Sequence, residues 1–265
     1  MPYWFNWITN SKLAAAADYT LSGGRLLISD AKDVLAMLGQ ESVSLISKEI
    51  GPSNYGKFYP TDRHGGFWKL GNPVGVVDHY TAGINTRPVL LWFSSRPREG
   101  DIVSSSAHFV IGRDGIIYSV VPPDLIAWHA TVANDTHIGI EHVNAGVLRR
   151  KTGTLRYQES IEYPKERTHS VQTINKEPWE PYTSNQLIAN IVLKRWLIEA
   201  FPSIEQQNCV DHAKISPDRK RDCGPLWPLK DLNKLVFDFT NARKIEWHDK
   251  QAIAKKDLTS LALLL

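Results

Sequence analysis

Cysteine is nearly absent from this chain, which has only Cys209 and Cys223 among its 265 residues. Two thiols do not make the disulfide framework of a small secreted domain, although they could form a single bridge or remain free. Long apolar runs are missing as well. No stretch approaches the roughly 20 apolar residues that a membrane span needs, and Leu261–Leu265 is far too short. The sequence therefore predicts neither a disulfide scaffold nor a membrane span.

A strong excess of one charge is also lacking, since the formal net charge is +3. Such a mild balance argues against nucleic acid as a partner, although it would suit an anionic polymer. The N-terminal stretch has no basic region, and its short apolar run Ala14–Ala17 lies between Lys12 and Asp18. We therefore expect no conventional signal peptide. The expected location is the cytoplasm, or the periplasm or cell wall after delivery by a non-classical route.

The overall composition is that of an ordinary globular protein, with 42% hydrophobic and 22% charged residues. Its length suits one sizeable domain with additions. Residues 1–65 carry no chemical motif and are predicted to be an N-terminal accessory extension, and residues 66–265 are predicted to form the main domain. Within the extension we expect a strand at Arg25–Ser29, a helix at Ala31–Leu38 and a linker rich in glycine and proline at 51–66.

From Asn72 onward, short β-branched runs alternate with amphipathic segments, which predicts an α/β fold. The loop Arg113–Gly115 is a hairpin signal. Thr183 and Gln186 form a capping box at the start of a helix that ends near Phe201. The expected strands are Val74–Tyr80, Ser105–Gly112, Ile116–Val121 and Ile138–Val143.

Three further segments complete the predicted domain. Residues 144–182 form a long polar connection, and an insertion of this kind in a compact domain is usually functional or mobile. Pro88–Phe93 suits a first helical turn. Leu229 to about Lys244 is predicted to be a C-terminal helix.

Histidine, aspartate and cysteine residues in two stretches could together form one zinc site. The strand Val74–Tyr80 delivers His79 to the edge of a sheet, and a later loop supplies His212 together with Asp222 or Cys223. Zinc takes neutral imidazole, thiolate or carboxylate ligands in a tetrahedral set, and a catalytic zinc keeps one position for water. Nine histidines offer many possible triples, so spacing alone does not single out this set.

Four motifs carry a resemblance to a known family: His79–Gly83, Ser106–Ile111 with Asp114–Gly115, Ala127–Ala130 followed by Ile138–Glu141, and His212–Pro225. In order and approximate spacing they resemble the type 2 zinc-dependent N-acetylmuramoyl-L-alanine amidases. That family includes cytoplasmic anhydro-muropeptide amidases and phage amidase lysozymes, and the peptidoglycan recognition proteins are its relatives. The resemblance covers roughly residues 70–240. It implies a mixed central β-sheet flanked by helices, with the site in a groove on the sheet.

By position, the resemblance implies metal ligands at His79, His212 and Asp222, with zinc as the only cofactor. Some relatives use cysteine as the last ligand, and Cys223 directly follows Asp222. The spacing from Lys220 favours Asp222 as the ligand. Adjacent residues in a loop rarely point the same way, so we do not expect both to bind the ion.

The resemblance also assigns roles around the metal. It places the general base at Glu141, where a carboxylate could accept a proton from the attacking water and return it to the leaving amine. It places at Lys220 the basic residue that stabilises the oxyanion. His129, Trp128 and Asn144 are expected to contact substrate in the groove.

The implied activity is hydrolysis of the amide that joins the lactyl group of N-acetylmuramic acid to L-alanine of the stem peptide, in peptidoglycan or in soluble muropeptides. Two alternatives remain open: a non-catalytic peptidoglycan-binding module, and a zinc peptidase that cuts within the stem peptide. The full set of candidate ligands with Glu141 argues against the first, and the lack of a His-Glu-x-x-His signature argues against the second. The extension and the insertion favour a lytic or delivered enzyme, whose delivery or immunity partner the sequence does not identify.

Overall fold

The computed structural model describes residues 19–22, 25–28, 63–68, 71–94, 105–158 and 160–246. In the N-terminal extension, β1 (Tyr19–Ser22) and β2 (Arg25–Ile28) pair as an antiparallel hairpin. The strand predicted from Arg25 is therefore confirmed. The helix predicted at Ala31–Leu38 and residues 51–62 of the predicted linker lie outside the described residues.

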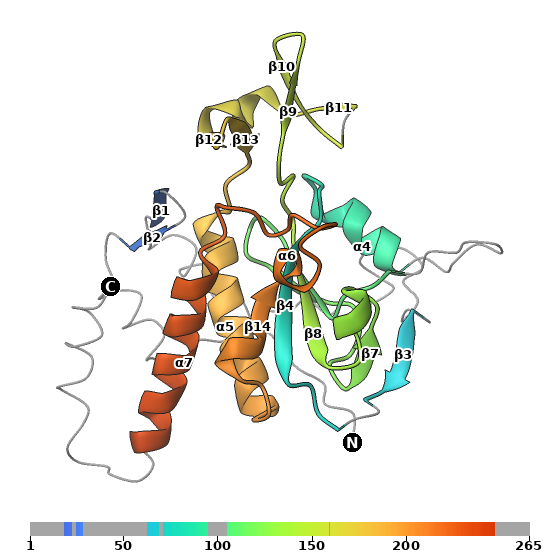
Figure 1. Ribbon diagram of the computed structural model, residues 1–265, viewed down its shortest axis with the longest axis vertical. Coiled ribbons are helices and arrows are strands. Elements are labelled where there is room, and N and C mark those ends of the chain that lie inside the picture. The colour runs from blue at the N-terminus through green and yellow to red at the C-terminus, as the bar shows by residue number, and fades with distance from the viewer. Residues whose placement is uncertain are drawn as a thin grey trace.

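A five-stranded sheet forms the centre of the domain (Figure 1). Its strand order is β14-β4-β8-β5-β6. The first four strands run parallel, and β6 runs antiparallel to β5, so the predicted mixed sheet and α/β class are confirmed. The strands are β4 (Gly75–Tyr80), β5 (Phe109–Ile111), β6 (Ile117–Ser119), β8 (His137–His142) and β14 (Cys209–Asp211).

One face of the sheet packs against helices α5 (Ser184–Ala200) and α7 (Leu229–Glu246). Successive strand residues point to opposite faces. Val76, Ile138 and Ile140 therefore project together into the core that the sheet shares with these two helices. The remaining positions of β4 and β8, which include His79 and Glu141, are left for the other face.

The start of α5 has the predicted capping box. The Thr183 side chain accepts a hydrogen bond from the Gln186 backbone N–H, and the Gln186 side chain accepts one from the Thr183 backbone N–H. Two of the N–H groups that a helix N-terminus leaves unpaired are thereby satisfied. The helix ends at Ala200, directly before Phe201, as predicted.

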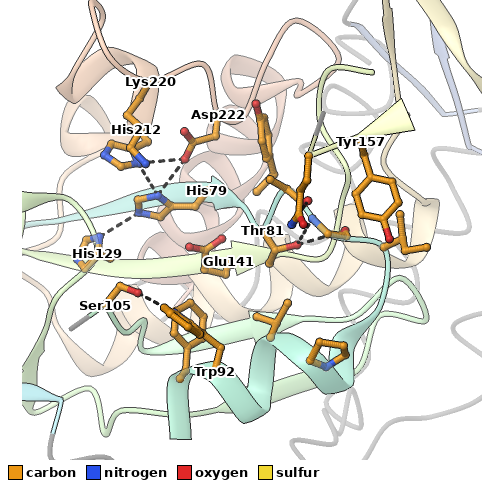
Figure 2. A pocket seen from close by; sticks show the side chains of 18 of the residues that line it. His79, Thr81, Trp92, Ser105, His129, Glu141, Tyr157, His212, Lys220 and Asp222 are labelled. Atoms are coloured by element: carbon orange, nitrogen blue, oxygen red, sulfur yellow. Dashed lines mark hydrogen bonds and ion pairs between the residues drawn. The ribbon is translucent and has the colours of Figure 1, made fainter. Parts of the chain in front are cut away.

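The opposite face of the sheet carries helix α4 (Thr86–Ser94), which contains the predicted helical turn. Leu90 and Phe93 of α4 pack with Val110 of β5 and with Val143 in a second buried cluster. The helix therefore lies on the same side of the sheet as His79 and Glu141, beside the groove described below (Figure 2).

The strand predicted at Ser105–Gly112 is shorter in the structure and covers only Phe109–Ile111. In the first part of the predicted strand, Ser106 has partners outside the five-stranded sheet. The Ser106 hydroxyl donates to the Arg63 carbonyl at 2.7 Å and accepts from the Trp128 N–H at 2.9 Å. The Ser106 N–H likewise donates to the Trp128 carbonyl at 2.9 Å, so this part of the segment bonds outside the sheet that Phe109–Ile111 joins.

Short elements fill the edges of the domain. Strands β3 and β7 pair antiparallel beside the main sheet, and α6 follows β14 directly. These elements are β3 (His64–Phe67), β7 (Leu125–Ala127), α6 (His212–Ile215) and the 3-10 turns η1 (Thr131–Ala133), η2 (Lys165–Ser170) and η3 (Gln206–Asn208). Among the described helices, none is long and apolar enough to cross a membrane.

The segment 144–182, expected to be a polar connection, contains five short strands and its own buried cluster. Glu180 is fully buried and anchors it, because the Tyr163 hydroxyl donates to this carboxylate at 2.8 Å and Arg113 pairs with it at 3.0 Å. The buried cluster includes Leu148, Leu155, Tyr157 and Tyr163. The strands are β9 (Arg149–Lys151), β10 (Thr154–Tyr157), β11 (Ile161–Glu162), β12 (Gln172–Ile174) and β13 (Glu177–Trp179), at the top of Figure 1.

Candidate active site

His79 and Glu141 come from neighbouring parallel strands. The register of β4 and β8 places them directly opposite each other. The alternation of the strand turns Asp78 to the other face, where it accepts a hydrogen bond from the buried Lys194 ammonium at 2.6 Å. The Asp78–Lys194 ion pair on one face and the His79 imidazole on the other thus follow from the alternation of side chains along β4.

His212 and Asp222 reach the same sheet edge from the loop after β14. His212 opens α6, and Asp211 caps that helix by accepting a hydrogen bond from the Lys214 N–H at 2.9 Å. The Ala213 N–H donates to the Asp222 carbonyl at 2.7 Å, which fixes the far end of the loop beside His212. Since β14 pairs parallel with β4, this loop begins at the end of the sheet where His79 lies.

Three side-chain atoms converge at this place (Figure 2). The Nδ1 atoms of His79 and His212 lie 2.9 Å apart, and Oδ2 of Asp222 lies 3.1 Å from the first and 3.0 Å from the second. All three residues are buried. A neutral imidazole carries one hydrogen for its two nitrogens, so a triangle this tight holds more lone pairs than hydrogens. Two nitrogens and one carboxylate oxygen are a donor set that fits a divalent metal ion.

Burial and mutual contact shift the pKa values of this cluster. Burial lowers the pKa of His79, although the neighbouring Asp222 carboxylate opposes this. Burial alone would raise the pKa of Asp222, but the imidazoles of His212 and His79 outweigh it and hold that pKa well below its usual range. A neutral imidazole and an ionised carboxylate are the forms that bind a metal ion.

Glu141 lies beside the cluster with a strongly perturbed carboxyl group. Its Oε2 atom is buried and has no hydrogen-bond partner within the described part of the chain. Burial, reinforced by the Asp222 charge and opposed by Lys220, raises the pKa of Glu141 to about 8. A carboxyl group in a cleft whose pKa lies near the pH of the reaction is suited to accept and return a proton.

A groove of about 750 Å³ runs over this centre. Of the residues expected to contact substrate, Trp128 and His129 line the groove, as does Lys220. Asn144 does not line it. Its side chain is buried and donates to the Glu180 and Pro181 carbonyls at 3.2 and 3.3 Å, so the structure directs it into the base of the insertion.

Several groove residues were not singled out from the sequence, and four of them matter for the argument below. Trp92 comes from α4 and is 54% exposed, and the insertion supplies Tyr157, Gln158 and Ile161. The alternation of side chains in Thr154–Tyr157 was a weak strand signal in the sequence. It gave no indication that Tyr157, at the end of this strand, would line the groove.

The two cysteines are separate, buried thiols rather than a bridge. Cys223 packs in the core with α5 and α7, and its carbonyl accepts a hydrogen bond from the Tyr182 hydroxyl at 2.8 Å. The structure thus turns Asp222 into the cluster and Cys223 away from it.

Comparison with known proteins places this arrangement in a family. The chain is 36% identical over 128 residues to the 1,6-anhydro-N-acetylmuramyl-L-alanine amidase AmpD of Salmonella typhimurium, covering 46% of this chain and 54% of that protein. It is 32% identical over 124 residues to the N-acetylmuramoyl-L-alanine amidase AmiD of Escherichia coli, covering 44% and 36%. The chain spans about half the length, or less, of these curated relatives.

A solved structure gives a further comparison. The crystal structure of a Se-Met AmpD derivative aligns with a TM-score of 0.48 at 25% identity, covering 67% of this chain and 92% of that one. The N-acetylmuramoyl-L-alanine amidase family itself matches residues 69–225, which include the whole candidate site. This chain therefore belongs to the type 2 N-acetylmuramoyl-L-alanine amidase family.

Proposed function

We propose that this protein hydrolyses the amide between the lactyl group of N-acetylmuramic acid and L-alanine of the stem peptide. The observation that carries the proposal is the triangle of His79, His212 and Asp222 next to Glu141, a carboxyl group with a raised pKa, and all four residues line one groove. The substrate would be peptidoglycan or a muropeptide, in line with the names of the relatives.

Zinc is the proposed metal, held by Nδ1 of His79, Nδ1 of His212 and a carboxylate oxygen of Asp222. Two imidazoles and one carboxylate leave a fourth position open, as catalytic zinc sites do. When bound, the ion would supply an activated water and polarise the scissile carbonyl. Cys223 has no part in the site.

Glu141 is the proposed general base. Its unpartnered carboxylate oxygen would take a proton as water attacks the lactyl carbonyl carbon, and would then deliver that proton to the departing L-alanine amine. A carboxyl group whose pKa lies near 8 in the metal-free protein binds a proton readily. The positive charge of a bound ion would lower this pKa, so that the ionised form would be populated at neutral pH.

Lys220 is proposed to stabilise the negative charge that develops on the amide oxygen. It lines the groove, and its charge is felt at Glu141 as a lowering influence on the pKa of that carboxyl group. An ammonium placed in a partly water-excluded site stabilises an oxyanion more strongly than it would in bulk water.

The remaining groove residues are proposed to hold the substrate on either side of the scissile bond. Trp128, His129 and Trp92 line it from the core domain, and Tyr157, Gln158 and Ile161 line it from the insertion. Gln158 also donates to the Ala82 carbonyl at 2.8 Å, which ties the insertion to the loop that follows His79. Asn144 is proposed to act indirectly, by holding the base of the insertion.

Mass spectrometry of peptidoglycan digests, with and without a zinc chelator, tests the proposal. We expect stem peptides with a free L-alanine amine, lost on chelation and restored by zinc. Cuts elsewhere in the peptide would instead identify a stem-peptide peptidase. Bound zinc without cleavage of sacculi or soluble anhydro-muropeptides would identify a binding module. The ratio of activity on sacculi to activity on soluble fragments would separate a lytic or delivered enzyme from a recycling one.

A further inference from the structure

His129 contacts both a candidate metal ligand and a backbone carbonyl group. Its Nδ1 lies 3.0 Å from Nε2 of His79, and its Nε2 lies 3.0 Å from the carbonyl oxygen of His137. We propose that His129 is a positioning residue, which fixes the tautomer of His79 and so prepares Nδ1 of that ring for the metal ion. The inference rests on the metal site proposed above and gives His129 a role other than substrate contact.

Only one arrangement of hydrogens satisfies this row of atoms when both rings are neutral. A carbonyl oxygen can only accept, so Nε2 of His129 carries a hydrogen and donates it to His137. Nδ1 of His129 is then a bare acceptor. The hydrogen between the two rings must therefore belong to Nε2 of His79, which leaves Nδ1 of His79 with a free lone pair.

That lone pair faces the metal cluster. Nδ1 of His79 and Oδ2 of Asp222 are 3.1 Å apart, and in this tautomer both are acceptors with no hydrogen between them. Whichever nitrogen of a neutral His212 carries its hydrogen, the triangle contains at most one hydrogen for its contacts of 2.9 and 3.0 Å to Nδ1 of that ring. A cation at the centre satisfies all three atoms at once. Hydrogen bonding to the distal nitrogen of a ligand histidine is a general way of orienting such ligands.

The surroundings of His129 hold its ring in this position. Oδ1 of Asn134 accepts hydrogen bonds from the backbone N–H groups of His129 and Ala130, at 2.9 and 2.8 Å. The ring lies directly against Gly139 of β8, where a Cβ atom would approach it to 2.5 Å. A side chain at position 139 would push the ring away, so this strand gives His129 its place beside His79.

His212 has no corresponding support. Its Nε2 atom is buried and lacks a hydrogen-bond partner among the described residues. Of the two histidines in the cluster, only His79 therefore has its tautomer fixed by a hydrogen bond at the ring nitrogen that faces away from the cluster. The loss of His129 should accordingly weaken metal binding more than it disturbs the fold.

Zinc affinity of three variants of the full chain tests the proposal. His129→Phe keeps a ring of similar size without nitrogens, His129→Asn keeps an acceptor at the position of Nδ1, and His137→Asn removes a nearby imidazole but leaves the backbone carbonyl. Competition with a chromophoric chelator gives Kd, and the Tm of the metal-free forms reports the fold. We expect Kd to rise about 10- to 100-fold in His129→Phe, less in His129→Asn, and not in His137→Asn.

A purely structural role for His129 would lower Tm and leave Kd unchanged, and that result would overturn the proposal. A second measurement needs no variant at position 129. Nitrogen-15 spectra of metal-free, histidine-labelled wild-type protein, assigned with His79→Asn, should show His79 protonated at Nε2. A hydrogen at Nδ1 would refute the inference even if the Phe variant does not fold. A protein that shows the expected tautomer but never cleaves a muropeptide would sink the proposed function alone.

Discussion

His79 and Glu141 occupy paired positions on the parallel strands β4 and β8, and both side chains line the groove. One register of one strand pair thus sets the candidate ligand and the candidate base side by side. A shift of either strand by one residue would turn its own side chain, His79 or Glu141, to the opposite face, where Asp78 and His142 now lie buried against α5. The chemistry of the site is therefore tied to the pairing of the two central strands.

Replacement of Glu141 by glutamine should separate metal binding from turnover. The amide has nearly the same shape but cannot take a proton, so we expect zinc affinity to stay close to that of the wild type while kcat falls by about 10²- to 10⁴-fold. Muropeptide cleavage followed by mass spectrometry, with the zinc content measured on the same samples, checks this. Unchanged turnover would remove Glu141 as the base.

Asp222 and Cys223 provide a matched pair of neighbouring residues. Asp222→Ala removes an oxygen from the triangle and should abolish tight zinc binding, whereas Cys223→Ser should leave zinc bound because that thiol lies in the core. Zinc content after dialysis against a weak chelator distinguishes the two. The reverse result, with Cys223→Ser losing the ion, would reassign the ligand to sulfur.

Lys220→Met should slow catalysis without releasing the metal. Loss of one group that stabilises an oxyanion typically costs about 10²- to 10³-fold in kcat. Lys214→Met is a suitable control, because Lys214 is an exposed lysine on α6 that does not line the groove. Equal losses in the two variants would point to a general effect of positive charge rather than to a specific role.

The raised pKa of Glu141 predicts a pH dependence of stability for the metal-free protein. Between pH 4.5 and about 8 the folded state holds a proton on Glu141 that the unfolded state releases. Protonation thus favours folding below this window, and the contribution is lost as pH rises through it. In the presence of a chelator, Glu141→Gln should therefore gain stability relative to wild type from pH 5 to pH 8. Urea unfolding of both proteins at pH 5 and at pH 8 measures the difference in unfolding free energy between them. The same difference at the two pH values would contradict a raised pKa of Glu141.

The sequence predicted much of the sheet and of the site, because strong local signals lie there. The β-branched run that ends in His79, the capping box at Thr183 and each of the four family motifs depend on residues close together in the chain. The position of the Asn144 side chain could not be read in this way. It depends on carbonyl groups at residues 180 and 181, which only the fold brings near.

The insertion was the least predictable part for a related reason. Its strands are two to four residues long, carry many charges and bury only a small cluster, so the alternation that marks a strand is weak. What orders it is Glu180, whose partners Tyr163 and Arg113 lie 17 and 67 positions away in the sequence. Long-range polar contacts of this kind leave no local pattern.

Glu180 therefore provides a test of whether the insertion is needed for the groove. Glu180→Ala removes a fully buried carboxylate from the Tyr163 hydroxyl, the Ala145 N–H and Arg113, and breaking a buried pair in this way should cost about 3–5 kcal/mol of unfolding free energy. Because the insertion supplies Tyr157, Gln158 and Ile161 to the groove, kcat/KM should fall through a higher KM while zinc remains bound.

The exposed pair of Glu177 and Arg221 gives the control for this prediction, since Glu177→Ala should cost no more than about 1 kcal/mol. Urea unfolding and limited proteolysis report stability, and steady-state kinetics on a soluble muropeptide report the groove. If Glu180→Ala loosens the insertion but leaves KM unchanged, the insertion does not contribute to substrate binding. The groove would then consist of the core domain alone, from α4 to the His212 loop.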